Sequence, residues 1–82
     1  MLLDQRLEAR IRAGARRIGF GGASYTEAAL VSEDGQSLRI YDGQLKEVSL
    51  SELEEGREYQ VTFRPFVNNH WIELKIVDLR PL

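Results

Sequence analysis

The chain has no cysteine, and His70 is its only histidine. The absence of thiols excludes disulfides, cysteine nucleophiles and thiolate metal sites. A zinc or catalytic centre needs partners that a lone histidine does not find here, so we expect His70 to be a turn residue. Ser24 and Ser32 stand in no motif that supplies a base, which leaves nucleophilic catalysis without support. We therefore expect no enzymatic activity, no metal and no cofactor.

Long hydrophobic runs are also missing. No apolar stretch approaches the roughly 20 residues that a membrane helix needs. The first three residues are apolar, but Asp4 and Arg6 follow at once, which is unlike a signal peptide. The length of 82 residues fits one domain spanning residues 1–82, and 43% hydrophobic with 29% charged residues is typical of a globular protein. We expect no membrane association and a cytoplasmic location.

An excess of positive charge is absent as well. Eleven basic and thirteen acidic residues give a net charge of −2, whereas proteins that depend on phosphate contacts are usually basic overall. Residues 1–20 nevertheless carry five arginines against two acids, and residues 21–58 carry nine acids against three basic residues. Any affinity for nucleic acid is therefore expected to be local and modest.

The end of the chain carries the clearest pattern. Two runs have an apolar residue at every second position: Tyr59, Val61, Phe63, then Ile72, Leu74 and Ile76. A period of two is typical of strands with one buried face. Residues 67–70 form a polar turn between the runs, so we expect a long hairpin whose apolar side chains face the core. Pro65 has no N–H to donate, so that end of the first strand is expected at an edge or a bulge.

The first segment, residues 3–18, is ambiguous between helix and strand. A helix would place four apolar residues on one stripe: Leu3, Leu7, Ile11 and Ile18. A strand would place four apolar residues on one face: Leu7, Ala9, Ile11 and Ala13. Gly14 costs a helix about 1 kcal/mol relative to alanine, but in a strand it marks a bulge or a sharp coil. We favour the strand.

The middle of the chain predicts two more strands and a short helix. Residues 25–32 and 37–42 are the strands, and Asp34-Gly35 between them predicts a tight hairpin turn, because a primed turn needs positive φ. Residues 49–55 are the predicted helix.

The predicted helix has candidate caps at both ends. Ser49 with Glu52 three positions later forms a capping box, and Gly56 is a candidate stop. An equivalent pair two residues later leaves the first residue of the helix open.

These elements give the order β-β-β-α-β-β within an all-β domain. That order is typical of the OB-fold, a five-stranded Greek-key barrel, here with one short helix between the third and fourth strands. The alternative is an SH3-like barrel in which an N-terminal helix replaces the first strand.

Two segments resemble a known family. Residues 8–17 read Glu-Ala-Arg-Ile-Arg-Ala-Gly-Ala-Arg-Arg, and residues 68–81 read Asn-Asn-His-Trp-Ile-Glu-Leu-Lys-Ile-Val-Asp-Leu-Arg-Pro. They are similar to the first and last strands of the OB domain near the C-terminus of RecJ-type single-strand-specific exonucleases. The resemblance implies a domain that helps to bind single-stranded DNA and packs against a nuclease core. The DHH-type metal motifs of the catalytic domains are absent, and residues 19–23 stand where the family's turn carries lysine or histidine.

Aromatic and basic residues point to a binding surface. The alternation places Arg39 and Tyr41 outward on the third strand, and Tyr25 leads the second strand. OB-folds bind oligonucleotides by aromatic stacking together with basic side chains. We interpret Tyr25, Arg39 and Tyr41 as a stacking platform, together with Phe20 at the end of the first strand. The alternative is that the aromatic rings only cover apolar surface.

Four arginines near the N-terminus form a basic cluster: Arg10, Arg12, Arg16 and Arg17. On a strand Arg10 and Arg12 share a face, and we expect Gly14 to let Arg16 join them. These arginines either contact phosphate or pair with the acidic middle of the chain.

Trp71 and Lys75 point outward by register and form a second patch, where Trp71 is a candidate anchor for a partner. The function we expect is a non-catalytic module that binds single-stranded DNA or RNA through its first three strands. The alternative is a protein–protein interaction domain, or an accessory domain that docks on a larger enzyme. A homodimer is a further option, because Trp71, Val77 and Leu82 are expected at the surface.

Overall fold

The computed structural model describes residues 3–31 and 36–82. Within them five strands and two short 3₁₀ turns follow one another: β1 (Leu7–Ile18), β2 (Ser24–Leu30), β3 (Ser37–Tyr41), η1 (Asp42–Gln44), η2 (Leu50–Glu52), β4 (Glu58–Asn68) and β5 (Trp71–Pro81). The described chain is therefore all-β. The first segment is a strand, so the alternative with an N-terminal helix is wrong. The turn expected at Asp34-Gly35 lies outside the described residues.

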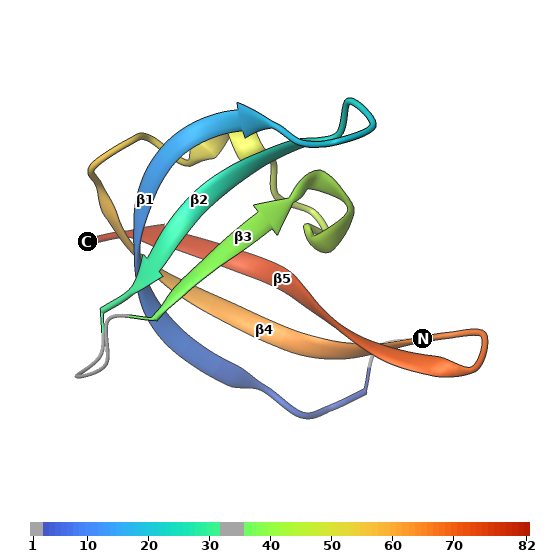
Figure 1. Cartoon of the computed structure of the whole chain (residues 1–82). Coiled ribbons are helices and arrows are strands. Elements are labelled where there is room, and N and C mark those ends of the chain that lie inside the picture. Colours follow the sequence, from blue (N-terminus) through green and yellow to red (C-terminus); the bar gives the residue numbers. More distant parts are fainter. Residues whose placement is uncertain (1–2, 32–35) are drawn as a thin grey trace.

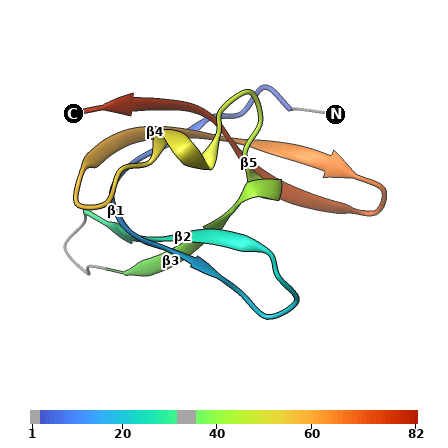
Figure 2. The same cartoon turned by 90° about the horizontal axis from the view of Figure 1, so that it is seen from above.

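All five strands belong to one antiparallel sheet with the order β3-β2-β1-β4-β5. The long, curved β1 pairs with β2 on one side and with β4 on the other (Figure 1). Seen from above, the sheet bends so that β2 and β3 lie opposite β4 and β5 (Figure 2). The sheet stays open, although a parallel bridge between Leu45 and Ile76 links the segment after β3 to the edge strand β5.

A bulge in β1 allows the strand to bend. Ala13 pairs with Ala28 and Arg16 pairs with Thr26, so the register shifts by one residue around Gly14, as its position in the pattern predicted. A side chain at Gly14 would place its Cβ 3.1 Å from the Glu27 carbonyl oxygen. The close approach of β1 and β2 at this bend therefore favours glycine.

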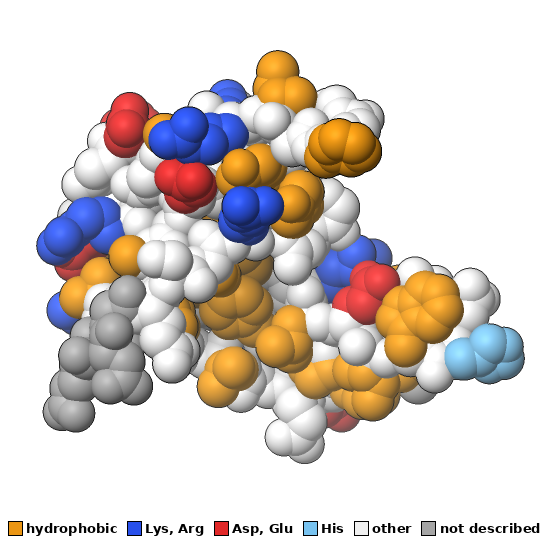
Figure 3. Space-filling view, viewed as in Figure 1, with side chains coloured by type: hydrophobic (Ala, Val, Ile, Leu, Met, Phe, Trp, Pro, Cys, Tyr) orange, Lys and Arg blue, Asp and Glu red, His pale blue; other side chains and the backbone are white. Residues whose placement is uncertain are grey.

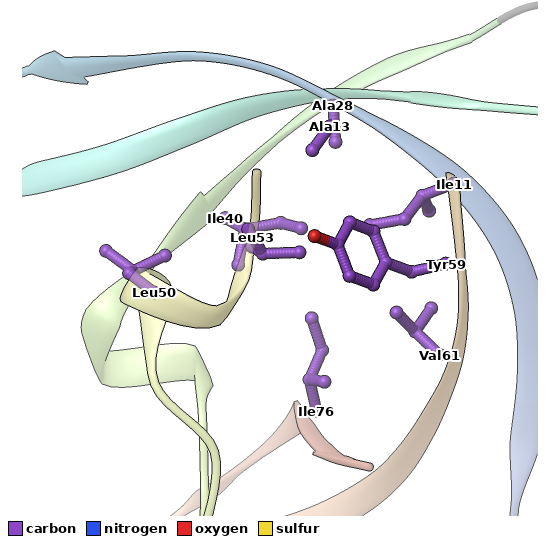
Figure 4. Close-up of a cluster of buried hydrophobic side chains, with 9 residues drawn as sticks. All are labelled: Ile11, Ala13, Ala28, Ile40, Leu50, Leu53, Tyr59, Val61 and Ile76. Atoms are coloured by element: carbon purple, nitrogen blue, oxygen red, sulfur yellow. The ribbon is translucent and has the colours of Figure 1, made fainter. Parts of the chain in front are cut away.

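The core lies between the two halves of the bent sheet. Its buried apolar side chains come from every strand and from the segment around η2: Ile11, Ala13, Ala28, Ile40, Leu50, Leu53, Tyr59, Val61 and Ile76 (Figure 4). Tyr59 sits at its centre, and its hydroxyl donates to the Glu52 carbonyl at 2.9 Å and accepts from the Glu54 N–H at 2.7 Å. These two bonds fasten the segment after η2 to β4.

The expected helix is a single 3₁₀ turn. Ser49 begins it as predicted, with its N–H donating to the Glu52 carboxylate at 2.6 Å. Leu53 is already extended, at φ −91° and ψ 111°, and buries its side chain in the core. Gly56 is not the helix stop: it has φ 84° and donates its N–H to the Ala13 carbonyl at 2.8 Å. No helix in the described part of the chain has the length and apolar character to cross a membrane.

β4 and β5 continue past the core as a projecting two-stranded ribbon, residues 64–75 (Figure 1). Asn69, the first residue of its turn, has φ 55°, as a primed turn requires. Pro65 lies opposite Leu74, and its carbonyl accepts from the Leu3 N–H at 3.0 Å. The missing N–H of Pro65 therefore faces the N-terminal segment, which confirms the prediction of an edge at this point.

The expectation that every apolar residue of this hairpin faces the core is wrong for its outer part. Ile76 is 1% exposed, but Leu74 is 48% and Ile72 is 66% exposed. The three share one face of β5, since side chains alternate along a strand. The core ends near Ile76, so the same face continues into solvent.

Candidate functional site

Tyr25, Arg39 and Tyr41 come together on the outer face of β2 and β3. Tyr25 and Tyr41 are direct cross-strand partners, and their ring centroids lie 5.2 Å apart at an angle of 42°. The guanidinium carbon of Arg39 lies 4.9 Å from the centroid of the Tyr25 ring. We call these three residues the tyrosine–arginine cluster.

The members of the tyrosine–arginine cluster differ in solvent exposure. Tyr25 is only 6% exposed, because Arg39 and Tyr41 flank its ring and the backbone of Gly19 lies against it. Arg39 is exposed and Tyr41 is half-buried. A ligand on this face would meet Arg39 and Tyr41, while Tyr25 holds them in place.

The neighbouring tyrosines also act on the pKa of Arg39. The Tyr41 side chain first, and then the nearby Tyr25, raise the pKa of Arg39 above its already high usual value. Like any arginine, Arg39 is charged at physiological pH, and its aromatic neighbours hold the guanidinium at a fixed place.

Phe20, which was expected at the end of the first strand as part of the stacking platform, lies in the loop between β1 and β2. Phe20 is fully exposed, and Ile18 just before it is 76% exposed. Phe20 lies next to Gly19, which packs against the ring of Tyr25, so it stands at the border of the tyrosine–arginine cluster. Gly21 and Gly22, both with φ near +90° (89° and 87°), complete this loop.

Two of the N-terminal arginines share the outer face with the tyrosine–arginine cluster and are held by acids. Arg12 contacts Glu58 at 2.8 Å, and Arg17 contacts Glu27 at 3.1 Å. Both arginine side chains are 58% exposed. Exposed pairs of this kind contribute about 0–1 kcal/mol, so an incoming phosphate can replace the carboxylate at little cost.

Arg10 lies on the same outer face as Arg12, and no ion-pair partner is found for it among the described residues. It is not close to the tyrosines. Arg10 lies six residues along the strand direction from the row of Tyr25 and Tyr41, which is roughly 20 Å at 3.3 Å per residue. Arg10 and Tyr41 thus mark the two ends of one face.

The expectation that Arg16 joins Arg10 and Arg12 is wrong. The bulge at Gly14 pairs Arg16 with Thr26, whose side chain points into the interior. Arg16 instead donates to the Leu50 carbonyl at 2.6 Å, across the open end of the sheet. Arg17 takes the outward position, which the shifted register explains.

A shallow hollow lies between the arginines of the outer face. It has a volume of about 500 Å³, and Arg12 and Arg39 stand on its rim. Its floor includes three small residues, Gly14, Ala29 and Ser37. The outer face of β1–β3 therefore runs from Tyr41 past Arg39 and this hollow to Arg12 and Arg10. In Figure 3 basic and acidic side chains alternate over the upper part of the molecule.

The second patch is on the β4–β5 ribbon. The Trp71 indole donates to the Glu73 carboxylate at 2.8 Å, and Lys75 contacts the same carboxylate at 3.2 Å. Lys75 also donates to the Gly43 carbonyl and lies 5.8 Å from the centroid of the Phe66 ring. Trp71 is 53% exposed, so it is open to a partner, while Lys75 is tied down. Figure 3 shows hydrophobic side chains along the ribbon up to the single histidine at its tip.

No group of three or more possible metal ligands (His, Cys, Asp, Glu) is found in residues 3–31 and 36–82. Comparison with protein-family models, with curated proteins and with solved structures finds no match to this chain. The geometry of its own surfaces is therefore the basis for assigning a function.

Proposed function

We propose that the chain is a non-catalytic module that binds single-stranded nucleic acid on the outer face of β1–β3. The tyrosine–arginine cluster is the observation that supports it most. Arg39 is exposed, charged and held 4.9 Å from the ring of Tyr25, beside the half-buried Tyr41. A planar cation beside an aromatic ring offers a base two surfaces to stack on.

The rest of the face fits an extended strand. A base stacks at Tyr41 and Arg39, with Phe20 at the border, and the phosphates that follow run over the hollow toward Arg12 and Arg10. Stacking contributes about 1–3 kcal/mol per base and tolerates any base, so little sequence preference is expected. The net charge of −2 keeps the affinity modest and dependent on salt.

We further propose that the open sheet is an OB-like Greek-key barrel. The strand order β3-β2-β1-β4-β5 supports this, and so does the parallel bridge that joins Leu45, in the segment after β3, to Ile76 on the edge strand β5. In OB-folds the face of strands two and three binds oligonucleotides. The resemblance of residues 8–17 and 68–81 to RecJ-type OB domains points the same way, toward single-stranded DNA.

Fluorescence anisotropy of a labelled ~15-nucleotide single strand tests the proposed function at low and at physiological salt. We expect saturable binding that weakens with salt and drops at least fivefold in Arg39→Ala, about 1 kcal/mol for one stacking contact. Arg80→Ala is the matched control, because Arg80 is exposed and paired with Asp78 on β5. Equal losses in both variants, or no binding at low salt, would reject the tyrosine–arginine cluster as the site.

A second candidate function is docking on another protein. It is favoured by the β4–β5 ribbon, where Trp71, Ile72 and Leu74 are each about half exposed or more (53%, 66% and 48%). Single exposed apolar residues are ordinary, but several on one projecting element mark interaction sites, here Ile72 and Leu74 on one face of the ribbon and Trp71 on the other.

A further inference from the structure

The outer edge of β5 has backbone groups that face away from the sheet. The Ile76 carbonyl accepts from the Lys46 N–H at 2.9 Å, so the backbone of Ile76 points away from β4. Backbone direction alternates along a strand, so Leu74 and Ile72 point the same way. The Leu3–Pro65 bond agrees, because it turns Pro65, the partner of Leu74, away from β5.

These outward groups are open. No backbone partner beyond β4 is found for Ile72 or Leu74 among the described residues. Natural edge strands are usually protected against pairing by a proline, a bulge or a lysine that points outward. Lys75 does not serve that purpose, because its ammonium group is held by the Gly43 carbonyl and the Glu73 carboxylate.

A groove of about 610 Å³ runs beside this edge. Tyr41, Gly43 and Gln44 form one wall, and Glu73, Leu74 and Lys75 with Asn68 form the other. At the end of the edge nearer the core, Leu45 already pairs with Ile76 in a parallel bridge, so this edge accepts a neighbouring segment there. Among the described residues, no strand of this sheet covers the edge of β5 alongside Trp71–Lys75.

We propose that the edge of β5 at residues 71–75 binds an extended, antiparallel segment of another protein by β-strand addition. This proposal rests on the second candidate function, docking on another protein, and gives it a binding mode. It does not depend on the nucleic-acid site. The side chains define the segment: apolar residues opposite Ile72 and Leu74, a basic residue opposite Glu73, and an acidic residue opposite Lys75. An aromatic or β-branched residue fits opposite Trp71.

A second copy of this chain is a poorer occupant. The register that pairs Ile72 with Leu74 of a second copy sets Glu73 directly opposite the other Glu73. Like charges directly opposite each other destabilise a strand pair. Pairing Leu74 with Leu74 of the second copy removes this clash but reaches Ile76, whose carbonyl already accepts from Lys46. Pairing Ile72 with Ile72 sets Leu74 opposite His70, which lies in the turn between β4 and β5.

The test uses the capped peptide Thr-Glu-Val-Lys-Val-Tyr-Thr. In the antiparallel pairing its glutamate stands opposite Lys75, its lysine opposite Glu73 and its tyrosine opposite Trp71. NMR titration of the labelled full chain should shift the amides of residues 71–75, with saturation. The control peptide exchanges the glutamate and lysine, and we expect it to bind at least tenfold more weakly. A third peptide, methylated on the nitrogen of the first valine, cannot donate to the Leu74 carbonyl and should lose binding without any change to the protein.

Chain variants add a second line. Leu74→Pro removes the outward N–H but no β4–β5 ladder bond, because the N–H of Leu74 faces away from β4. Its matched control is Leu74→Val, which keeps the N–H; we expect at least a tenfold loss in the first and little change in the second. The inference is overturned if the peptides bind equally, if shifts fall outside residues 71–75, or if the chain alone self-associates through these residues. Oligonucleotide binding can succeed or fail independently of each result.

Discussion

At the scale of single residues, Tyr59 joins the core to the segment after η2. It is 1% exposed, and its hydroxyl bonds the Glu52 carbonyl and the Glu54 N–H. Removing the hydroxyl leaves both backbone groups without this partner in a partly buried place. An unsatisfied buried group costs about 1–3 kcal/mol.

We therefore expect Tyr59→Phe to lower the free energy of unfolding by about 1–3 kcal/mol, measured by urea denaturation. Tyr41→Phe is the matched control, because Tyr41 is half-buried at the surface. Loss of its hydroxyl should change the free energy of unfolding by about 0.5 kcal/mol or less. Equal stability of Tyr59→Phe and the wild type would show that the hydroxyl bonds do not hold this segment.

The carboxyl group of Glu73 is the second residue with a distinct expectation. The Trp71 indole first, and Lys75 second, hold the pKa of Glu73 below its usual value. A pKa lower in the folded than in the unfolded state contributes stability above the unfolded pKa, and that stability is lost as the pH falls through the folded pKa. Since Glu73 is open to solvent, the contribution to stability is small.

NMR titration of the Glu73 side-chain carboxyl carbon should give a pKa below the usual range for glutamate. Trp71→Phe removes the indole donor and should raise this pKa toward the usual value. His70→Asn is the control, because His70 lies beside Trp71 but makes no hydrogen bond to Glu73 that the structure shows. An unchanged pKa of Glu73 in Trp71→Phe would contradict the hydrogen bond between the indole and the carboxylate.

At the scale of elements, β4 and β5 show what the sequence can and cannot predict. The period of two predicted both strands and their inner faces correctly, because alternation follows from strand geometry. It did not predict where burial ends: Ile72 and Ile76 have the same phase but are 66% and 1% exposed. Burial depends on which distant strands lie opposite, and the local pattern does not contain that information.

The β1 bulge set a similar limit for the site. Gly14 predicted a bulge, but not that the shift would turn Arg17 outward and Arg16 toward Leu50. The tyrosine–arginine cluster was predictable in part, because alternation put Arg39 and Tyr41 on one face. That Tyr25 lies beneath Arg39 depends on the pairing of β2 with β3.

Hydrogen exchange should resolve the two halves of the β4–β5 hairpin. Near Val61 the ladder lies over the core, whereas from Phe66 to Leu74 the ribbon projects without such cover. Amides of the ribbon should therefore exchange by local opening, at least a hundredfold faster than the Val61 amide, which needs larger unfolding. Equal protection along the whole hairpin would mean that the ribbon and the core open as one unit.

At the scale of the whole molecule, two separate surfaces are candidates for binding. The outer face of β1–β3 carries the tyrosine–arginine cluster and weakly held arginines, and the β4–β5 ribbon carries an open strand edge with apolar side chains. Arg12 and Arg17 are paired with acidic side chains that a phosphate can replace. A chain of net charge −2 can therefore still offer positive charge to a ligand on this face. A module with both surfaces would hold a single strand while docked on a partner.

NMR titration of the labelled chain with an unlabelled ~15-nucleotide single strand tests the central proposal most directly. Stacking on the outer face predicts that the largest shifts fall on the amides and side chains of Arg39 and Tyr41, extending toward Arg12, and that they fade as salt is raised. Absence of shifts at low salt, or shifts confined to residues outside β1–β3, would contradict single-strand binding by the tyrosine–arginine cluster.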